Sequence, residues 1–406
     1  MVTISEMLEI LRKNFSMVFF ASLLFIFPAL ATSPYQVVIL TNMLIWGIFA
    51  LSYDILLGQA GVLSFGHTVP FGVAAYLTAF LLTQGFPFII ALLVSIVMGA
   101  MSNLVIGLLC SKAKGVYYAI LSLALAETLR ISVENIANYM GTSPSVLTKL
   151  PPIIKSEYFF YLDLILAIIL VVSGIIASLY IVLTRVKNLK NRIELSIRAV
   201  FYIILVMFLI YGAFLLIAKM DTLVERTTIT VNLFYLSLIL FLVTYLFAKI
   251  IVRSPLGSVW RAVRENPERA EALGYNILVY QLYALAISGG IAGVAGSLFS
   301  MTTIVNPTTA FSPFNTLMAL LAVILGGTGT LIGPVMGAWI VQYLKLTLGS
   351  IPQLSILSMA ILGLLYIIII LVFPYGIMGT WYYNCLLYTS DAADDGESVD
   401  LGGRRI

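Results

Sequence analysis

Long, nearly uninterrupted apolar runs are the feature that most constrains this chain. Hydrophobic residues make up 61% of its 406 residues and charged residues only 10%, whereas a soluble domain is about one quarter charged. A soluble fold cannot hide so much apolar surface, and the runs do not alternate as the strands of a lipid-facing barrel would. We therefore predict an all-α integral membrane protein, a polytopic helical bundle of about 9–12 transmembrane segments.

Hydropathy and turn residues place these segments along the chain. We expect helices near residues 17–32, 36–57, 69–84, 88–110, 117–136, 158–184, 199–219, 232–252, 277–300, 314–326, 335–348 and 354–374. The short pair 314–326 and 335–348 is separated by glycines, which predicts a helical hairpin that does not fully cross. The stretch 58–67 is a candidate re-entrant segment, and the run 17–32 reads as a retained helix because no small-residue cleavage site follows it.

Basic residues gather on one side of the predicted membrane, in the segments 112–114, 185–198 and 249–269. Because Lys and Arg are enriched in cytoplasmic loops, this side is predicted to face the cytoplasm. The longest hydrophilic stretch among the predicted spans, 253–276, lies there and reads RSPLGSVWRAVRENPERAEALGYN. Its apolar positions recur at helical spacing, at Val259, Ala262, Val263, Ala270 and Leu273. With Asn266 as N-cap and Pro267 at the first helical position, the stretch predicts two short helices with a charged face.

Motifs for chemistry are missing from the sequence. It has no G-x-x-x-x-G-K-[ST] nucleotide loop, and its single histidine, His67, excludes a zinc-type His/Cys cluster or a Ser/His/Asp set. Its two cysteines, Cys110 and Cys385, argue against a disulfide framework or a thiolate metal site. We expect no catalytic residues, no metal site, no cofactor of its own and no nucleic-acid partner. If the chain carries out transport, the energy must come from a gradient or from another subunit.

Three glycine-rich stretches lie at membrane depth. In the middle one, Gly289, Gly293 and Gly296 have the small-residue spacing that favours close helix packing. In the first and third, Gly occurs with Pro, Ser, Thr and His, which suggests interrupted helices that line a translocation path, with packing as an equally weighted alternative. The path candidates are Gly58, Gly61, Ser64, Gly66, His67, Gly326, Gly327, Gly329 and Thr330.

Ionisable residues at membrane depth form one further group. Glu127, Arg130 and Glu134 share a helix face, so the arginine can pair with both acids. This spacing favours a self-neutralising structural cluster over a proton relay. Asp54 and His67 flank the first glycine stretch, and for His67 a structural role is favoured slightly over contact with a substrate.

The last residues differ in character from the rest. From Cys385 to Ile406 the chain becomes polar, acidic and then basic. The codons that would encode the start of this stretch resemble a sequencing-library adapter. We therefore expect residues 385–406 to be a non-native tail, with a short disordered cytoplasmic tail as the alternative.

Four stretches, in this order and spacing, carry a family resemblance: LSYDILLGQAGVLSFGHTVPFGVAAY, KGVYYAILSLALAETL, SPLGSVWRAVRENPERAEALGYN and AVILGGTGTLIGPVMGA. Together they resemble the LivM-type permease subunits of branched-chain amino-acid ABC importers, from about residue 36 to 374. The resemblance implies a permease domain over residues 1–384 in a prokaryotic plasma membrane, with 253–276 as cytoplasmic coupling helices. The implied partners are ABC ATPase subunits that bind the ATP, a second, LivH-like permease subunit and an extracytoplasmic substrate-binding protein.

The resemblance also assigns residues and leaves alternatives. The implied ATPase-coupling residues are Arg261, Arg264, Glu265, Asn266, Glu268, Arg269, Glu271 and Gly274. The outer stretch GTSPSV lacks an expected Gly-Gly step and residues 196–231 look lengthened, so a urea or short-amide permease is an alternative to a carrier of branched-chain amino acids. A stand-alone secondary transporter or channel that uses Glu127, Arg130 or His67 for protons is the rival from another class.

Overall fold

The computed structural model describes residues 34–113, 115–139, 145–146, 148, 220–351, 358–372 and 376–380. Its contacts divide the chain into two compact units, Met1–Thr41 with Leu150–Leu242, and Asn42–Lys149 with Val243–Ile406. The packing and the site described below belong to the second unit. The helices predicted at 17–32, 158–184 and 199–219 and the predicted tail 385–406 lie outside the described residues.

The described residues are helical, with one isolated bridge between Val146 and Val305, which confirms the all-α class. The helices are α3 (Pro34–Asp54), which continues as the π-helix η1 (Ile55–Gln59), α4 (Thr68–Thr83), α5 (Phe88–Leu109), α6 (Val116–Tyr139), α9 (Met220–Arg253), α10 (Pro255–Glu265), α11 (Pro267–Ala272), α12 (Ile277–Thr302), α13 (Pro307–Ala310), α14 (Pro313–Gly326), α15 (Ile332–Ser350) and α17 (Ser358–Val372). Within the described ranges, six helical stretches are long and apolar enough to cross a membrane. A multi-pass membrane protein is therefore confirmed.

The predicted boundaries agree with these helices to within a few residues, with one larger difference. Helix α9 begins at Met220, whereas the sequence predicts a start at 232. The stretch MDTLVERTT contains several residues of good helix propensity, so the backbone stays helical where hydropathy falls. The short stretch 58–67 leaves helical geometry after Gln59 and resumes it at Thr68.

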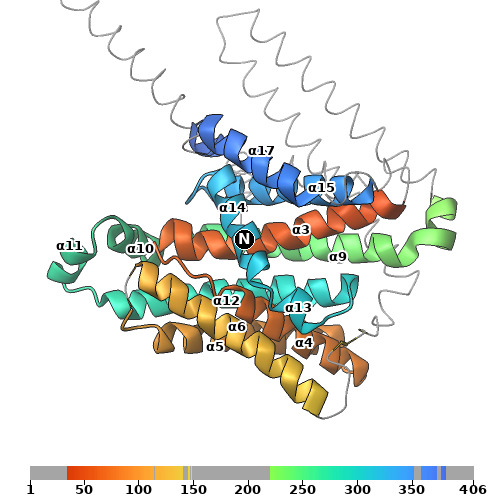
Figure 1. The fold of residues 1–406 in the computed structure, drawn as a ribbon, viewed down its shortest axis with the longest axis horizontal. Helices are drawn as coiled ribbons and strands as arrows, with labels where there is room; N and C mark the ends of the chain where they lie inside the picture. Colours follow the sequence, from red (N-terminus) through yellow and green to blue (C-terminus); the bar gives the residue numbers. More distant parts are fainter. Residues whose placement is uncertain are drawn as a thin grey trace, which may run out of the picture. The chain divides into compact units, whose positions relative to one another are not determined.

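Helix α12 packs against α5 and α4, and small residues allow the approach (Figure 1). A Cβ at Gly289 would lie 2.6 Å from the carbonyl oxygen of Gly99, and one at Gly293 would lie 2.7 Å from the carbonyl oxygen of Ser95. A Cβ at Gly296 would meet the carbonyl oxygen of Phe71 in α4. The packing role predicted for the middle glycine stretch is therefore confirmed.

Side-chain hydrogen bonds fasten the same interface. Asn103 of α5 donates its Nδ2 to the carbonyl of Leu285 at 2.8 Å and to the hydroxyl of Ser288 at 3.2 Å. Thr78 of α4 donates to Ser297 Oγ at 2.9 Å. Because lipid offers these groups no partner, buried polar pairs between helices help to specify how the helices pack.

Helices α14 and α15 pack on each other, and α17 contacts both of them. A Cβ at Gly326 would meet the carbonyl of Gly333, and one at Gly337 would meet the carbonyl of Ala322. The predicted helical pair is therefore present, although α15 begins at Ile332 and not at 335. That the pair stops short of a full crossing stays a prediction.

Candidate functional site

The charged stretch 253–276 forms two short helices, α10 and α11, as the sequence predicts. Figure 1 shows them at the end of the bundle where α12 begins, with α13 toward its opposite end. Pro255 occupies the first turn of α10, and Pro267 that of α11. The side chain of Asn266 accepts a hydrogen bond from the backbone N–H of Arg269 at 3.0 Å, so the predicted N-cap is confirmed.

The buried face of α10 agrees with the one predicted from spacing at Val263 and differs from it elsewhere. It consists of Gly257, Trp260 and Val263, and Trp260 donates its indole N–H to the carbonyl of Tyr280 in α12 at 2.9 Å. The bulky Trp260 ring takes the inward position. Ala262 is therefore exposed, although the sequence places it on the apolar face.

Helix α11 shows the same partial agreement. Ala270 is buried as predicted, whereas Leu273 is 76% exposed and does not belong to the buried face. Leu273 already lies beyond the last helical residue, Ala272, so helical spacing no longer decides where its side chain points. An exposed leucine beside charged residues leaves an apolar spot on the outer face of the helix pair.

The charged residues predicted to couple to an ATPase occupy the outer face of this helix pair. The exposed ones include Glu265, Glu268, Arg269 and Glu271. Arg261 instead donates to the carbonyl of Val252 at 3.2 Å and so ties α10 to the end of α9. Gly274 has φ +88°, a conformation that favours glycine, and its N–H bonds to the carbonyl of Glu271 at 2.8 Å. Gly274 therefore ends α11.

Arg264 differs from the other charged residues of α10 because its side chain bonds to the first glycine stretch. Its Nη1 donates to the carbonyl of Gly58 at the end of η1. Gly61, at φ +72°, lies beside it, and a Cβ on Gly61 would come within 2.7 Å of Arg264 Cγ. The absence of a side chain at Gly61 thus gives Arg264 its access.

The π-helix explains why the Gly58 carbonyl is available. After η1 the backbone N–H groups of Ala60, Gly61 and Val62 bond to the carbonyls of Ile55, Leu57 and Leu56. An α-helical register would have given the N–H of Val62 to Gly58. Because that N–H is used elsewhere, the guanidinium of Arg264 supplies the donor.

Asp54 connects this region to the third glycine stretch. Its side chain is 0% exposed, Oδ1 accepts from the N–H of Gly329 at 2.7 Å, and Oδ2 accepts from the N–H of Leu331 at 3.2 Å. Gln59 donates its Nε2 to the carbonyl of Gly329 at 2.8 Å. We call the group of Asp54, Gly58, Gln59, Arg264, Gly329 and Leu331 the junction.

Backbone conformation in the turn 327–331 shows what the junction holds in place. Leu331 has φ +62°, the only positive φ at a non-glycine among the described residues. Such a conformation costs about 1–3 kcal/mol and persists only where surrounding contacts fix it. The carboxylate of Asp54 supplies such a contact. A Cβ on Gly58 would meet both this carboxylate and the N–H of Gly329, so glycine is needed for their approach.

The remaining path candidates make local contacts. A Cβ on Gly66 would lie 2.6 Å from the carbonyl of Ser122 in α6, and Gly326 is occupied in packing against Gly333. The N–H of Gly327 bonds to Val323 at the end of α14. Thr330 Oγ1 donates to the carbonyl of Gly327 at 2.8 Å and so closes the turn. These contacts suit packing and turn formation, and a role in a path stays a prediction for them.

His67 and Ser64 are buried in the second unit. His67 shares a 2.9 Å hydrogen bond with Ser52 Oγ of α3 and stacks on the ring of Phe49 at 5.5 Å between centroids. Tyr53 meets the imidazole edge-on. These contacts support the structural role favoured for His67.

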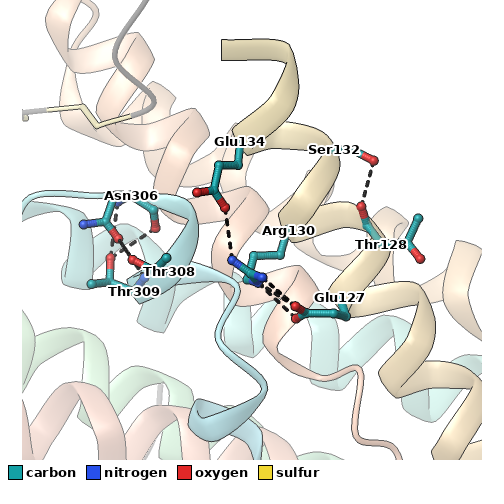
Figure 2. A network of polar contacts seen from close by, with 8 residues as sticks. All are labelled: Glu127, Thr128, Arg130, Ser132, Glu134, Asn306, Thr308 and Thr309. Atoms are coloured by element: carbon teal, nitrogen blue, oxygen red, sulfur yellow. Dashed lines mark hydrogen bonds and ion pairs between the residues drawn. The ribbon is translucent and has the colours of Figure 1, made fainter. Parts of the chain in front are cut away.

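The intramembrane charge cluster forms on one face of α6, as predicted (Figure 2). Arg130 lies 2.6 Å from Glu127 and 3.1 Å from Glu134, and it contacts Glu127 through both Nε and Nη2. Figure 2 shows the cluster beside the loop in which Asn306 caps the short helix α13. Arg130 therefore pairs with both acids as predicted, and the three side chains together keep one formal negative charge.

The central part of the junction is not predicted by the sequence. Asp54 was noted only as flanking the first glycine stretch, and Gln59 and Leu331 were not singled out. One signal was present, since an acidic residue in an apolar helix needs a partner inside the protein. That this partner is the backbone of a turn at residues 329 and 331 depends on tertiary contact.

Comparison with known proteins places these features in a family context. Residues 36–370 match the family described as branched-chain amino acid transport system permease component. The chain is 35% identical over 94 residues to a probable branched-chain amino acid transport permease protein LivM of Methanocaldococcus jannaschii, covering 23% of this chain and 27% of that protein. It is 24% identical over 279 residues to the probable LivH of the same organism, covering 63% of this chain and 87% of that protein.

A third similarity extends the comparison to bacteria. The high-affinity LivM permease protein of Escherichia coli is 26% identical over 146 residues, covering 36% of this chain and 34% of that protein. The chain therefore spans about a quarter to a third of the LivM relatives and most of the LivH relative. No solved structure matches the chain.

Proposed function

The chain belongs to the family of branched-chain amino acid transport permease components, and from this premise we propose that it is the membrane subunit of an ATP-driven importer. In this proposal it forms the translocation path together with a second, LivH-like permease subunit. ATP is bound and hydrolysed on separate ATPase subunits, and an extracytoplasmic binding protein delivers the cargo. The chain itself is a transport subunit and not an enzyme.

The observation that carries the proposal is the helix pair α10 and α11. Its outer face carries the exposed charged side chains of Glu265, Glu268, Arg269 and Glu271. The buried side chains of Trp260 and Val263 fix the pair to the rest of the unit. A chain without a nucleotide-binding motif needs a soluble partner to use ATP, and an exposed charged surface on the predicted cytoplasmic side suits such a partner.

The apolar surface of α5 and α6 is compatible with a second permease subunit beside this one. Helix α5 exposes apolar side chains along one face, including Leu93, Val97 and Met101, and α6 exposes Tyr117 and Ile120. A surface of this kind faces either lipid or another membrane protein. The charge cluster on α6 favours protein over lipid on that side, because intramembrane charges usually face the interior of a bundle.

The cargo we propose is a branched-chain or related hydrophobic amino acid, with urea or a short amide as the alternative. The support comes from the relatives, which are described as branched-chain amino acid permeases. Few strong side-chain contacts to cargo are needed in a permease that receives it from a binding protein. Uptake measured with leucine, isoleucine, urea and acetamide in competition distinguishes these cargo classes.

The coupling surface is tested by replacing Glu265 and Arg269 with alanine. Both side chains are exposed, so the fold and the assembly with the second permease subunit are expected to persist. ATP-driven uptake is expected to fall because charges that meet the ATPase are gone. Wild-type uptake by the double variant would refute the coupling assignment. Lys112→Ala, an exposed cation outside this surface, serves as the control.

The rival function, a secondary transporter that moves protons through Glu127 and Arg130, draws on the charge cluster in α6. In the structure Arg130 satisfies both acids, which favours a fixed structural pair over groups that exchange protons. A secondary transporter also works without an ATPase, a second permease and a binding protein, so it gives no reason to find their genes beside this one. The presence of those genes beside this one is an inexpensive first test.

A further inference from the structure

Three segments that are distant in the chain meet at the junction, and we propose that it transmits movement from α10 to the turn 327–331. Arg264 and Asp54 act as positioning residues in this transmission: Arg264 links α10 to η1, and Asp54 links η1 to the turn. The proposal rests on the proposed function, because the movement begins with an ATPase bound to α10 and α11.

Helix α10 is attached to the rest of the unit at two points. Trp260 is 1% exposed and is held through its indole N–H by the carbonyl of Tyr280 in α12. Arg264 follows one helical turn later and binds the Gly58 carbonyl. A tilt of α10 about the anchored Trp260 therefore moves the guanidinium of Arg264, and with it the end of η1.

The segment that includes Asp54 and η1 is attached to the turn through Gly329. Both backbone groups of Gly329 are held from this side, its N–H by Asp54 Oδ1 and its carbonyl by Gln59 Nε2. A displacement of residues 54–59 therefore carries Gly329 with it. The contact is direct, because Gly58 has no side chain to separate Asp54 from the turn.

In this transmission the turn 327–331 is an element with two states. Leu331 keeps a positive φ while Asp54 Oδ2 accepts its N–H. When that bond is released, a leucine favours negative φ, so the turn has a second backbone conformation available. Bistable elements of this kind convert small displacements into discrete rearrangements. The turn also connects α14 to α15, so its conformation determines how α14 ends and how α15 begins.

The test uses the complete complex of this chain, its second permease, ATPase and binding protein in liposomes. Thr328, an exposed residue of the turn, is changed to cysteine. Cys385 is replaced by serine so that it is not labelled, and Cys110 is kept because it is buried. Labelling by a membrane-impermeant maleimide is followed with and without ATP and vanadate, and uptake of tritiated leucine is measured in parallel. Trapping nucleotide is expected to change the labelling rate of the wild-type turn.

Arg264→Gln is expected to abolish this nucleotide-dependent change and to lower leucine uptake per ATP hydrolysed by about tenfold, in line with loss of one charge-assisted hydrogen bond. Arg264→Lys, which retains a cationic donor, is expected to recover part of the change. Lys112→Gln removes an exposed cation outside the stretch 253–276 and is the matched control, with wild-type labelling and uptake expected.

Asp54→Asn is expected to give the same loss, and combining it with Arg264→Gln is expected to add little, because both act through one chain of contacts. The proposed transmission would be overturned if the loss of uptake in the double variant equalled the product of the two single losses. A nucleotide-dependent change in labelling that persists in Arg264→Gln would also overturn it. These results differ from a failure of the proposed function. If the wild-type complex took up none of leucine, isoleucine, urea and acetamide with ATP, the function would be wrong and the transmission would fall with it.

Discussion

Replacing Gly289 and Gly290 by alanine, one at a time, tests whether the middle glycine stretch exists for packing. The two residues are neighbours in α12, and both are buried. A Cβ at Gly289 would lie 2.6 Å from Gly99 O and 2.6 Å from Asn103 Cβ. A Cβ at Gly290 would have Ile96 Cγ2 as its nearest neighbour at 3.5 Å, an ordinary van der Waals distance.

The expected magnitude follows from this difference. Each substitution gains the same helix propensity, up to about 1 kcal/mol. That gain cancels when the two variants are compared, which isolates the cost of overpacking at Gly289. Forcing a methyl group into a close-packed contact costs about 1–3 kcal/mol. Gly289→Ala is therefore expected to be less stable than Gly290→Ala by that amount.

The assay is the free energy of unfolding in lipid bicelles, measured by steric trapping of the purified chain. Gly99→Ala probes the same contact from α5, since its Cβ would lie 2.6 Å from Gly289 O and 3.1 Å from Gly293 Cα. Combined with Gly289→Ala it is expected to cost less than the sum of the two, because one separation of the helices relieves both clashes. Equal stability of Gly289→Ala and Gly290→Ala would refute the packing account.

Three further predictions concern the site and its surroundings. Asp54→Ala leaves the N–H groups of Gly329 and Leu331 without their acceptor. It is expected to lower the free energy of unfolding by about 1–3 kcal/mol for each N–H, and Asp54→Asn is expected to lower it less. The same unfolding assay measures both variants. Asn266→Ala removes the cap of α11 and is expected to cost about 0.5–2 kcal/mol locally, seen as faster amide hydrogen exchange at Arg269, whereas unchanged exchange there would contradict the cap. Glu127→Gln is expected to destabilise the chain more than Glu134→Gln, because Arg130 holds Glu127 through two nitrogens and Glu134 through one, and a reversed order in thermal unfolding would contradict the observed geometry.

Much of the fold follows from sequence because apolar length and small-residue spacing act locally. The sequence predicts the helices near 88–110 and 277–300 to within a few residues, and the spacing of Gly289, Gly293 and Gly296 predicts their packing role. The N-cap at Asn266 was likewise a local signal. The early start of α9 is not predicted from the sequence. Hydropathy indicates which residues can lie in lipid and does not indicate where helical hydrogen bonding begins.

The site was predictable only in pieces. The sequence points to the first and third glycine stretches as a translocation path and to Arg264 as part of a coupling surface, and it does not connect the two. Their meeting depends on a π-helical turn that frees the Gly58 carbonyl and on Asp54 reaching Gly329. Neither event has a sequence pattern of its own. The orientation of Trp260 was missed for a related reason, because period alone does not say which bulky side chain fills a given gap.

The central claim, that this membrane chain works as the permease of an ATP-driven importer, is tested most directly by uptake of tritiated leucine into proteoliposomes. One set contains this chain alone under a proton or sodium gradient, and the other contains it with its second permease, ATPase and binding protein. We predict accumulation only in the second set and only when both ATP and binding protein are supplied. Gradient-driven accumulation by this chain alone would contradict the account.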